Sequence, residues 1–243
     1  MMAEMLRFPL KTPKLNKILF IFFKNISKTM KKLAIFDFDG TLFDSVWDVV
    51  ICFNRTLEIH GFPTLTHEEY LDRLGGNIDE IVSLVLKDKN TAENMELVKT
   101  TYAKMYSDSP KDNTKPFAKT HEVLNALQEK GIYLAINSNR TNDSIRMYVD
   151  EFFNDIDFKA IEGHNPPYPS KPSPYGVERI MDQLKVTKEE TIYIGDSITD
   201  IRTSQNAEID CILVSWGYGR KEAFESDYPI ETVDDVCDLL KII

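Results

Sequence analysis

Short, mainly apolar runs alternate along the chain with longer segments in which apolar residues recur at helical spacing. The runs predict buried strands, and the spacing predicts helices between them. Because strands and helices alternate, the sequence predicts an α/β fold, a Rossmann-like parallel sheet with helices on both faces. The predicted strands are 33–38, 132–136, 158–161, 191–194 and 211–214, and the predicted helices are 120–130, 141–152, 174–184, 199–206 and 233–240.

One part of the chain, residues 46 to 106, contains helical patterns only. Ser45 is expected to cap the first of these helices, and Thr66 with Glu69 forms a capping-box pattern at the second. We therefore predict a small helical cap domain inserted into the α/β core. Its predicted helices are 46–60, 66–74, 78–86 and 91–106; the predicted boundaries are 32–45 and 114–243 for the core, 46–113 for the cap, and 1–31 for a basic N-terminal extension outside the fold.

Charge is distributed unevenly along the chain, whose formal charge is −10. Residues 1–32 hold eight Lys or Arg against one Glu, and the remainder holds 21 bases against 38 acids, a net charge of −17. An acidic body repels nucleic acid, so no nucleic-acid partner is expected. The apolar run 18–23 is far shorter than the ~20 residues that cross a bilayer, so no transmembrane segment is expected. We interpret the basic segment as a plain extension; the alternative is a membrane-surface anchor.

The three cysteines, Cys52, Cys211 and Cys237, are far apart and lie among apolar residues. Their odd number and spacing favour buried free thiols rather than a disulfide framework or a metal site. Free thiols indicate a reducing compartment, so we expect a cytoplasmic protein. The sequence leaves the oligomeric state open between a monomer and a homodimer.

Candidate chemistry begins at the end of the first strand, with Asp37, Asp39 and Gly40. Residues two apart on a strand point to the same side, and ligands of open α/β sheets bind beyond the carboxyl ends of the strands. Two neighbouring carboxylates raise each other's pKa unless a cation lies between them, which indicates a divalent metal. A calcium loop is excluded because the sixth position counted from Asp37 is Leu42 rather than Gly.

Polar residues also follow the later strands of the predicted sheet. In a parallel sheet the carboxyl ends of the strands converge on one edge, so these side chains are expected to meet the first two acids there. Together they supply acids for a metal and hydroxyl, amide and ammonium donors for a phosphate group. The residues are Ser138 and Asn139, then Lys171 in a loop that enters a helix, then Asp196 and Asp200.

These four groups, taken in order, resemble the four motifs of the haloacid dehalogenase superfamily. The resemblance covers about residues 32 to 243, and the inserted helices are similar to the helical cap of that family. Within it the chain most resembles phosphoglycolate phosphatases. The segments that carry this subgroup resemblance are Asp44-Ser45, Lys171-Pro172-Ser173-Pro174 and 214–219. Two positions depart from the subgroup: Ser138 stands where Thr is more usual, and Arg140 where Lys is frequent.

The resemblance implies a phosphatase that acts on a small phosphorylated metabolite, with phosphoglycolate as the expected substrate. Asp37 would attack phosphorus and form an aspartyl phosphate, and Asp39 would serve as acid and then as base. Mg²⁺ would be held by Asp37, by the backbone carbonyl of Asp39 and by Asp196. Phosphate would be bound by Gly40, Ser138, Asn139 and Lys171, and Asp200 would orient Lys171 or a metal-bound water.

Three alternatives remain open from the sequence. A sugar phosphomutase shares the four motifs and returns the phosphate to its substrate, and a pyrophosphatase shares them with another substrate. The third alternative belongs to a different class, a non-catalytic module that binds a phosphorylated ligand, because fold analogy alone does not establish activity.

Overall fold

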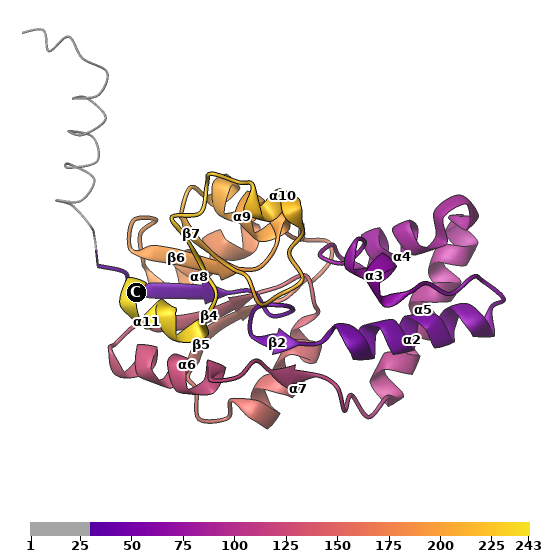
Figure 1. Ribbon diagram of the computed structural model, residues 1–243, viewed down its shortest axis with the longest axis horizontal. Helices are drawn as coiled ribbons and strands as arrows, with labels where there is room; N and C mark the ends of the chain where they lie inside the picture. The colour runs from indigo at the N-terminus through magenta and orange to yellow at the C-terminus, as the bar shows by residue number, and fades with distance from the viewer. Residues whose placement is uncertain (1–29) are drawn as a thin grey trace, which may run out of the picture. The chain divides into compact units, whose positions relative to one another are not determined.

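A six-stranded parallel sheet forms the centre of the α/β core (Figure 1). The computed structural model describes residues 30–243; the predictions for residues 1–29 lie outside this range. The chain divides into Met1–Met30 and Lys31–Ile243, and the fold is that of the second unit. The strands are β1 (Leu33–Phe36), β4 (Tyr133–Asn137), β5 (Phe158–Glu162), β6 (Thr191–Gly195), β7 (Asp210–Val214) and β8 (Glu231–Val233), in the order β5-β4-β1-β6-β7-β8.

Helices cover both faces of the sheet, because each central strand is apolar on both sides. On β1, Ala34 and Phe36 pack in one buried cluster, and Leu33 and Ile35 pack in another on the opposite face. This alternation follows from the two-residue repeat of a strand. The first cluster includes side chains of α6 (Thr120–Glu129), α7 (Asn142–Phe152) and α11 (Leu239–Ile242), and the opposite face is covered by α8 (Tyr175–Leu184) and α9 (Ile198–Ala207). The predicted fold class is confirmed.

Four helices between β2 and β3 form the insertion, called here the helical insertion, around a separate buried cluster. Thr66 and Glu69 make the predicted capping box. Ser45 occupies the N-cap position of the first helix, but its side chain makes no capping bond, so the prediction that it caps the helix was wrong. The helices are α2 (Val46–Ile59), α3 (His67–Leu71), α4 (Ile78–Leu86) and α5 (Ala92–Asp108), with a 3₁₀ turn at Lys87–Lys89. The predicted domain boundaries themselves stay a prediction.

A two-residue antiparallel ladder joins the two chain segments that lead into and out of this insertion. It consists of β2 (Phe43–Asp44) and β3 (Lys115–Pro116), and it was not predicted from the sequence. Asp48, buried in the first turn of α2, reinforces it by accepting hydrogen bonds from the backbone and side-chain amides of Asn113 and from the hydroxyl of Thr114. The segment that enters the insertion and the segment that leaves it are therefore bonded to each other.

Two predictions at element level were wrong. The first strand ends at Phe36 rather than at residue 38, because the chain turns there: the amides of Leu42 and Phe43 both donate to the carbonyl of Phe38. The predicted helix 233–240 is replaced by strand β8, a 3₁₀ turn at Val236–Asp238 and the short helix α11. A further short helix, α10 (Lys221–Phe224), was not predicted. No described helix combines the length and the hydrophobicity that crossing a membrane requires.

Candidate active site

Three buried carboxylates meet at the carboxyl end of the sheet. Asp37 follows β1, and Asp196 and Asp200 follow β6; one oxygen of each lies within 4.8 Å of the others. The ammonium group of Lys171 bridges two of them, at 2.8 Å from Asp37 and 2.7 Å from Asp200. Asp200 is held in turn by the amide and hydroxyl of Ser197, because it belongs to the capping box of α9.

These groups shift one another's pKa values strongly. Burial, with the nearby charge of Asp200, raises the pKa of Asp37 to about 7 despite its contact with Lys171. Burial and the charges of Asp200 and Asp37 also raise the pKa of Asp196 well above its usual range. Burial opposes the charged form of Lys171, yet Asp200 and Asp37 outweigh it and raise its pKa. Three acids that share one cation carry excess negative charge, and their closely spaced oxygens suit a hard divalent metal such as Mg²⁺.

The cluster differs from the predicted metal ligands in one member. Asp200, predicted to act on Lys171, contacts Lys171 and also lies within the cluster. The side chain of Asp39 is directed elsewhere, to an ion pair with Arg140 whose closest distance is 2.6 Å. The predicted metal contact of Asp39 is its backbone carbonyl, and that stays a prediction.

Asp39 lies in an environment unlike that of Asp37. Desolvation favours its neutral form, but the charge and hydrogen bonds of Arg140 and a bond from the hydroxyl of Ser45 outweigh this and lower its pKa. Its side chain is 34% exposed, compared with 9% for Asp37. The two acids, two residues apart, therefore differ in the direction of their pKa shift and in the exposure of their side chains.

Gly40 allows the turn to fold closely against Asp196. Its φ of 80° lies in the left-handed region, and a Cβ atom at this position would overlap the carboxylate of Asp196. Its amide donates to the carbonyl of Phe43 at 2.9 Å, within the turn. The backbone amide of Tyr218 donates to the Asp196 carboxylate at 2.6 Å.

The remaining predicted phosphate ligands lie on adjoining loops. Ser138 follows β4 and is buried, and it lines the same pocket as Lys171. Asn139 bridges loops: its carbonyl oxygen accepts from the amide of Lys171 at 2.8 Å, and its amide group donates to Gly75 of the helical insertion at 3.2 Å. Asn139 thus contributes its side chain to the position of the Lys171 loop.

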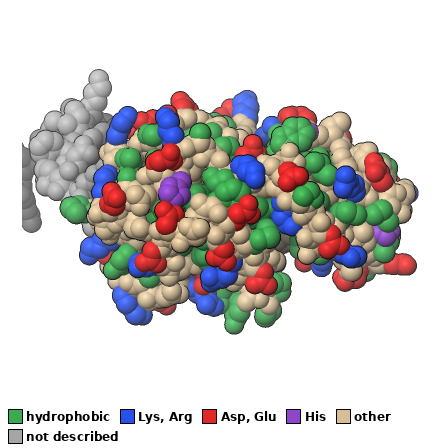
Figure 2. Space-filling model, turned by 90° about the horizontal axis from the view of Figure 1, so that it is seen from below, with side chains coloured by type: hydrophobic (Ala, Val, Ile, Leu, Met, Phe, Trp, Pro, Cys, Tyr) green, Lys and Arg blue, Asp and Glu red, His purple; other side chains and the backbone are tan. Residues whose placement is uncertain are grey.

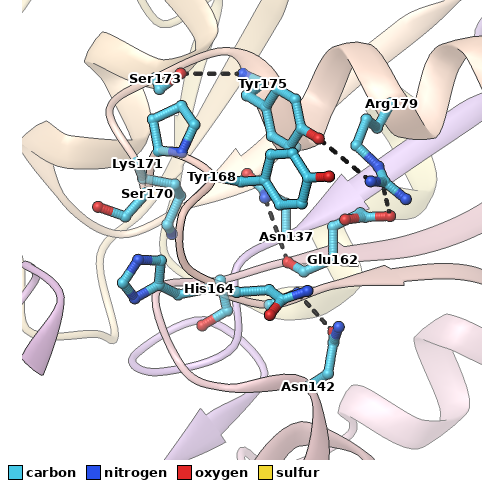
Figure 3. Close-up of a pocket in the computed structure, with 15 residues that line it drawn as sticks. Asn137, Asn142, Glu162, His164, Tyr168, Ser170, Lys171, Ser173, Tyr175 and Arg179 are labelled. Atoms are coloured by element: carbon cyan, nitrogen blue, oxygen red, sulfur yellow. Dashed lines mark hydrogen bonds and ion pairs between the residues drawn. The ribbon is translucent and has the colours of Figure 1, made fainter.

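The pocket beside these donors has a volume of about 90 Å³ and lies between the ends of β4 and β5 and the start of α8. Figure 3 shows Arg179 at its edge, where it contacts both the hydroxyl of Tyr175 and the carboxylate of Glu162 at 3.3 Å. Asp37 and Asp196 are not among its lining residues. The pocket is therefore lined by Ser138 and Lys171, two of the predicted phosphate ligands, and by none of the three clustered acids.

Several residues at the site were missed as site residues in the sequence. Arg140 was noted as a departure from a family pattern, Ser45 as a helix cap and as part of the Asp44-Ser45 resemblance, and Tyr218 as part of a similar segment; none was assigned a role in the site. The hydroxyl of Tyr218 accepts from the amide of Ser45 at 2.6 Å and donates to Asp44 at 2.8 Å. Their roles depend on contacts between residues far apart in the chain, which spacing does not encode.

Comparison with known proteins is consistent with this geometry. Residues 34–214 match the family model described as haloacid dehalogenase-like hydrolase. A phosphoglycolate phosphatase from Aquifex aeolicus is 29% identical over 212 residues, covering 87% of this chain and 96% of the relative. A second one, from Psychrobacter arcticus, is 28% identical over 218 residues, covering 86% of this chain and 94% of the relative.

Solved structures support the same family. One from Bacteroides fragilis, provisionally described as a haloacid dehalogenase-like hydrolase, is 29% identical with a TM-score of 0.80, covering 86% of this chain and 99% of that chain. The chain belongs to the haloacid dehalogenase-like hydrolase family. Family and relatives together identify it as an enzyme, a phosphoric monoester hydrolase.

Proposed function

We propose that the protein is a Mg²⁺-dependent phosphatase that hydrolyses phosphoglycolate, a small phosphomonoester, through an aspartyl-phosphate intermediate. The observation that carries this proposal is the buried contact of Asp37 with Lys171 beside Asp196 and Asp200. A carboxylate held next to an ammonium group, in a cluster that suits a divalent cation, is arranged to meet an anionic phosphoryl group. The names of the relatives support the choice of substrate.

In the first half-reaction an oxygen of Asp37 forms a bond to phosphorus as the bond from phosphorus to the leaving oxygen breaks. Asp39 gives its proton to that oxygen, and an alcohol departs. Ser138 and Lys171 hold the phosphoryl oxygens, Asn139 holds the Lys171 loop, and Gly40 keeps the turn close to the acids. Bound Mg²⁺, held by Asp37, Asp196 and the carbonyl of Asp39, would neutralise charge on the transferring group and lower the pKa of Asp37.

In the second half-reaction Asp39 takes a proton from water, whose oxygen attacks phosphorus and releases Asp37. Asp39 is ionised in the ligand-free protein, as this base role requires, and its first role requires a proton. A phosphoryl dianion next to Asp39 raises its pKa, so substrate binding itself favours the protonated form. Lys171 stays paired with Asp200 throughout and keeps its charge at the phosphoryl group.

The proposal is tested by phosphate release from phosphoglycolate, with Mg²⁺ present or chelated. Turnover that depends on Mg²⁺ is expected. A sugar phosphate and pyrophosphate in the same panel test the phosphomutase and pyrophosphatase alternatives, through isomer formation and preferential hydrolysis respectively. Binding of phosphoglycolate without release of phosphate would contradict the proposal and favour the non-catalytic module.

We also propose a cytoplasmic location, with the enzyme acting as a monomer or homodimer. Support for the location comes from the cysteines. All three are free; Cys52 and Cys211 are buried and Cys237 is half-buried. Free thiols fit a reducing compartment.

A further inference from the structure

Arg140 contacts Asp39 with two of its nitrogens. Nη2 lies 2.6 Å from Oδ1, and Nε lies 3.2 Å from Oδ2, so the guanidinium group grips both carboxylate oxygens. A bidentate fork fixes the plane of a carboxylate as well as its position, which a single ammonium group does not. Arg140 therefore determines which way the oxygens of Asp39 point.

The guanidinium group is itself held in place from several directions. Its carbon lies 5.1 Å from the ring centre of Phe38, 5.3 Å from that of Tyr106 and 5.7 Å from that of Tyr148, distances typical of cation–π contacts. The Arg140 side chain is only 10% exposed, whereas that of Asp39 is 34% exposed. The support is buried, and the acid that it supports faces the accessible side.

One of these supports comes from the helical insertion. Nη1 of Arg140 donates to the hydroxyl of Tyr106, near the end of α5, at 2.7 Å, and to the hydroxyl of Ser144 at 3.0 Å. Because the Tyr106 oxygen accepts from Arg140, its own proton is available for the hydroxyl of Tyr148 on α7, at 2.8 Å. A chain of bonds thus runs from α7 of the core through Tyr106 and Arg140 to Asp39.

We propose that Arg140 is a positioning residue for proton transfer by Asp39, and that Tyr106 extends this support to the helical insertion. This inference rests on the proposed function, in which Asp39 protonates the leaving oxygen. Stability alone is a weak explanation for the pair, because replacing a buried ion pair by apolar residues is often neutral or stabilising. A role in orienting a catalytic acid explains why Arg140 binds both carboxylate oxygens of Asp39 and why the Asp39 side chain remains accessible.

The test uses the dependence of rate on the leaving group. An alkoxide is a poor leaving group and needs a proton as it departs, whereas p-nitrophenolate leaves without one. The measured quantity is kcat/KM with saturating Mg²⁺, which reports the steps up to departure of the alcohol, on phosphoglycolate, ethyl phosphate and p-nitrophenyl phosphate. Arg140→Gln is expected to lower kcat/KM about 10- to 100-fold on both alkyl phosphates, and less than about 3-fold on p-nitrophenyl phosphate.

Further variants connect this effect to Asp39 and to α5. Asp39→Asn should show the same substrate preference with a larger loss, and adding Arg140→Gln to it should cause little further loss, because both act on one step. Tyr106→Phe removes only a hydroxyl and should give the same pattern at about 3-fold. Tyr70→Phe is the matched control. It removes another buried hydroxyl of the helical insertion, bonded to Asn54 at 2.9 Å, and should leave kcat/KM unchanged on all three substrates.

Three results would overturn the inference. Equal losses on all three substrates would indicate a structural role for Arg140. A loss confined to phosphoglycolate, with ethyl phosphate spared, would indicate that Arg140 binds the substrate carboxylate. Full additivity of Asp39→Asn and Arg140→Gln would separate the two residues. If the wild-type enzyme released phosphate from none of the substrates, the proposed function would fail and this inference with it.

Discussion

Asp37 and Asp39 are separated by one residue, yet their carboxylates have opposite electrostatic environments. Asp37 is buried and shares Lys171 with Asp200, so burial, with the charge of Asp200, raises its pKa to about 7. Asp39 has Arg140 as its own partner, and its pKa is lowered. Environments that separate the pKa values of neighbouring acids are a recognised way of giving them different roles.

Replacing Asp37 by Asn tests the nucleophile. The amide is nearly the same size and can still contact Lys171, so the fold should be retained, but it cannot form the acyl phosphate. We expect kcat on phosphoglycolate to fall more than about 10³-fold. Circular dichroism and thermal unfolding without metal should show a folded protein no less stable than the wild type. Full activity in this variant would refute the assignment of Asp37.

Metal binding should stabilise the protein more at pH 8 than at pH 6. A carboxyl group whose folded pKa is raised stabilises the folded state at low pH, and this contribution is lost as the pH rises through about 7. The metal-free protein therefore loses stability over this range, and bound Mg²⁺ should offset the loss because it favours the ionised acids. At about 100 times its Kd, a ligand adds about 2.7 kcal/mol to the free energy of unfolding.

Thermal unfolding with Mg²⁺ or with EDTA at the two pH values measures this difference. In Asp37→Asn the pH dependence of the metal effect should be smaller, because the titrating group has been removed. A Mg²⁺-induced increase in Tm that is larger at pH 6 than at pH 8 would contradict the expectation.

At the scale of elements, the ladder between β2 and β3 controls how the helical insertion joins the core. Asp48 accepts three hydrogen bonds from Asn113 and Thr114 and ties α2 to the returning segment. Asp48→Asn would place an N–H group against one of these donors. Because the site is buried, we expect a loss of about 1–3 kcal/mol in the free energy of unfolding.

Chemical denaturation of the Mg²⁺-saturated enzyme measures this loss. Asp88→Asn is the matched control, since Asp88 is exposed on the 3₁₀ turn after α4 and its replacement should change stability by less than about 0.5 kcal/mol. Equal effects of the two substitutions would show that the contacts of Asp48 contribute nothing measurable.

The elements that the sequence predicted are those with strong periodic patterns. The central strands are apolar on both faces, and parallel strands place Asp37, Asp196 and Asp200 on one edge, so their meeting could be predicted. Strand β8 has only three residues, two of them exposed, and carries too little pattern to identify. The pairing of Arg140 with Tyr106 was also unpredictable, because it depends on how the helical insertion folds back against the core.

Polar contacts on the surface also join the helical insertion to the core. Arg220 of the core pairs with Glu68 at 2.7 Å and with Asp72 at 2.9 Å, and Asn77 donates to the hydroxyl of Ser170 at 2.9 Å. These contacts join exposed or half-exposed groups, and exposed ion pairs contribute little stability each. The core and the helical insertion are therefore linked by buried contacts at the ladder and at Tyr106, and by weaker, more exposed contacts at Arg220 and Asn77.

The net charge of the molecule predicts how kcat/KM depends on salt. Residues 33–243 carry 38 acids and 21 bases, and Figure 2 shows basic side chains dispersed among acidic ones on the face in view. The buried cations at the site are already paired with acids. An anionic substrate is therefore repelled by the net negative charge of residues 33–243, and added salt screens that repulsion.

With Mg²⁺ held at saturation, kcat/KM for phosphoglycolate should rise about 2- to 3-fold between ~0.02 M and ~0.2 M monovalent salt. p-Nitrophenyl phosphate carries one negative charge fewer because it lacks the carboxylate, so its rise should be smaller. A fall in kcat/KM with salt, larger for phosphoglycolate, would show that the site's own cations attract the substrate at long range and outweigh the acidic body.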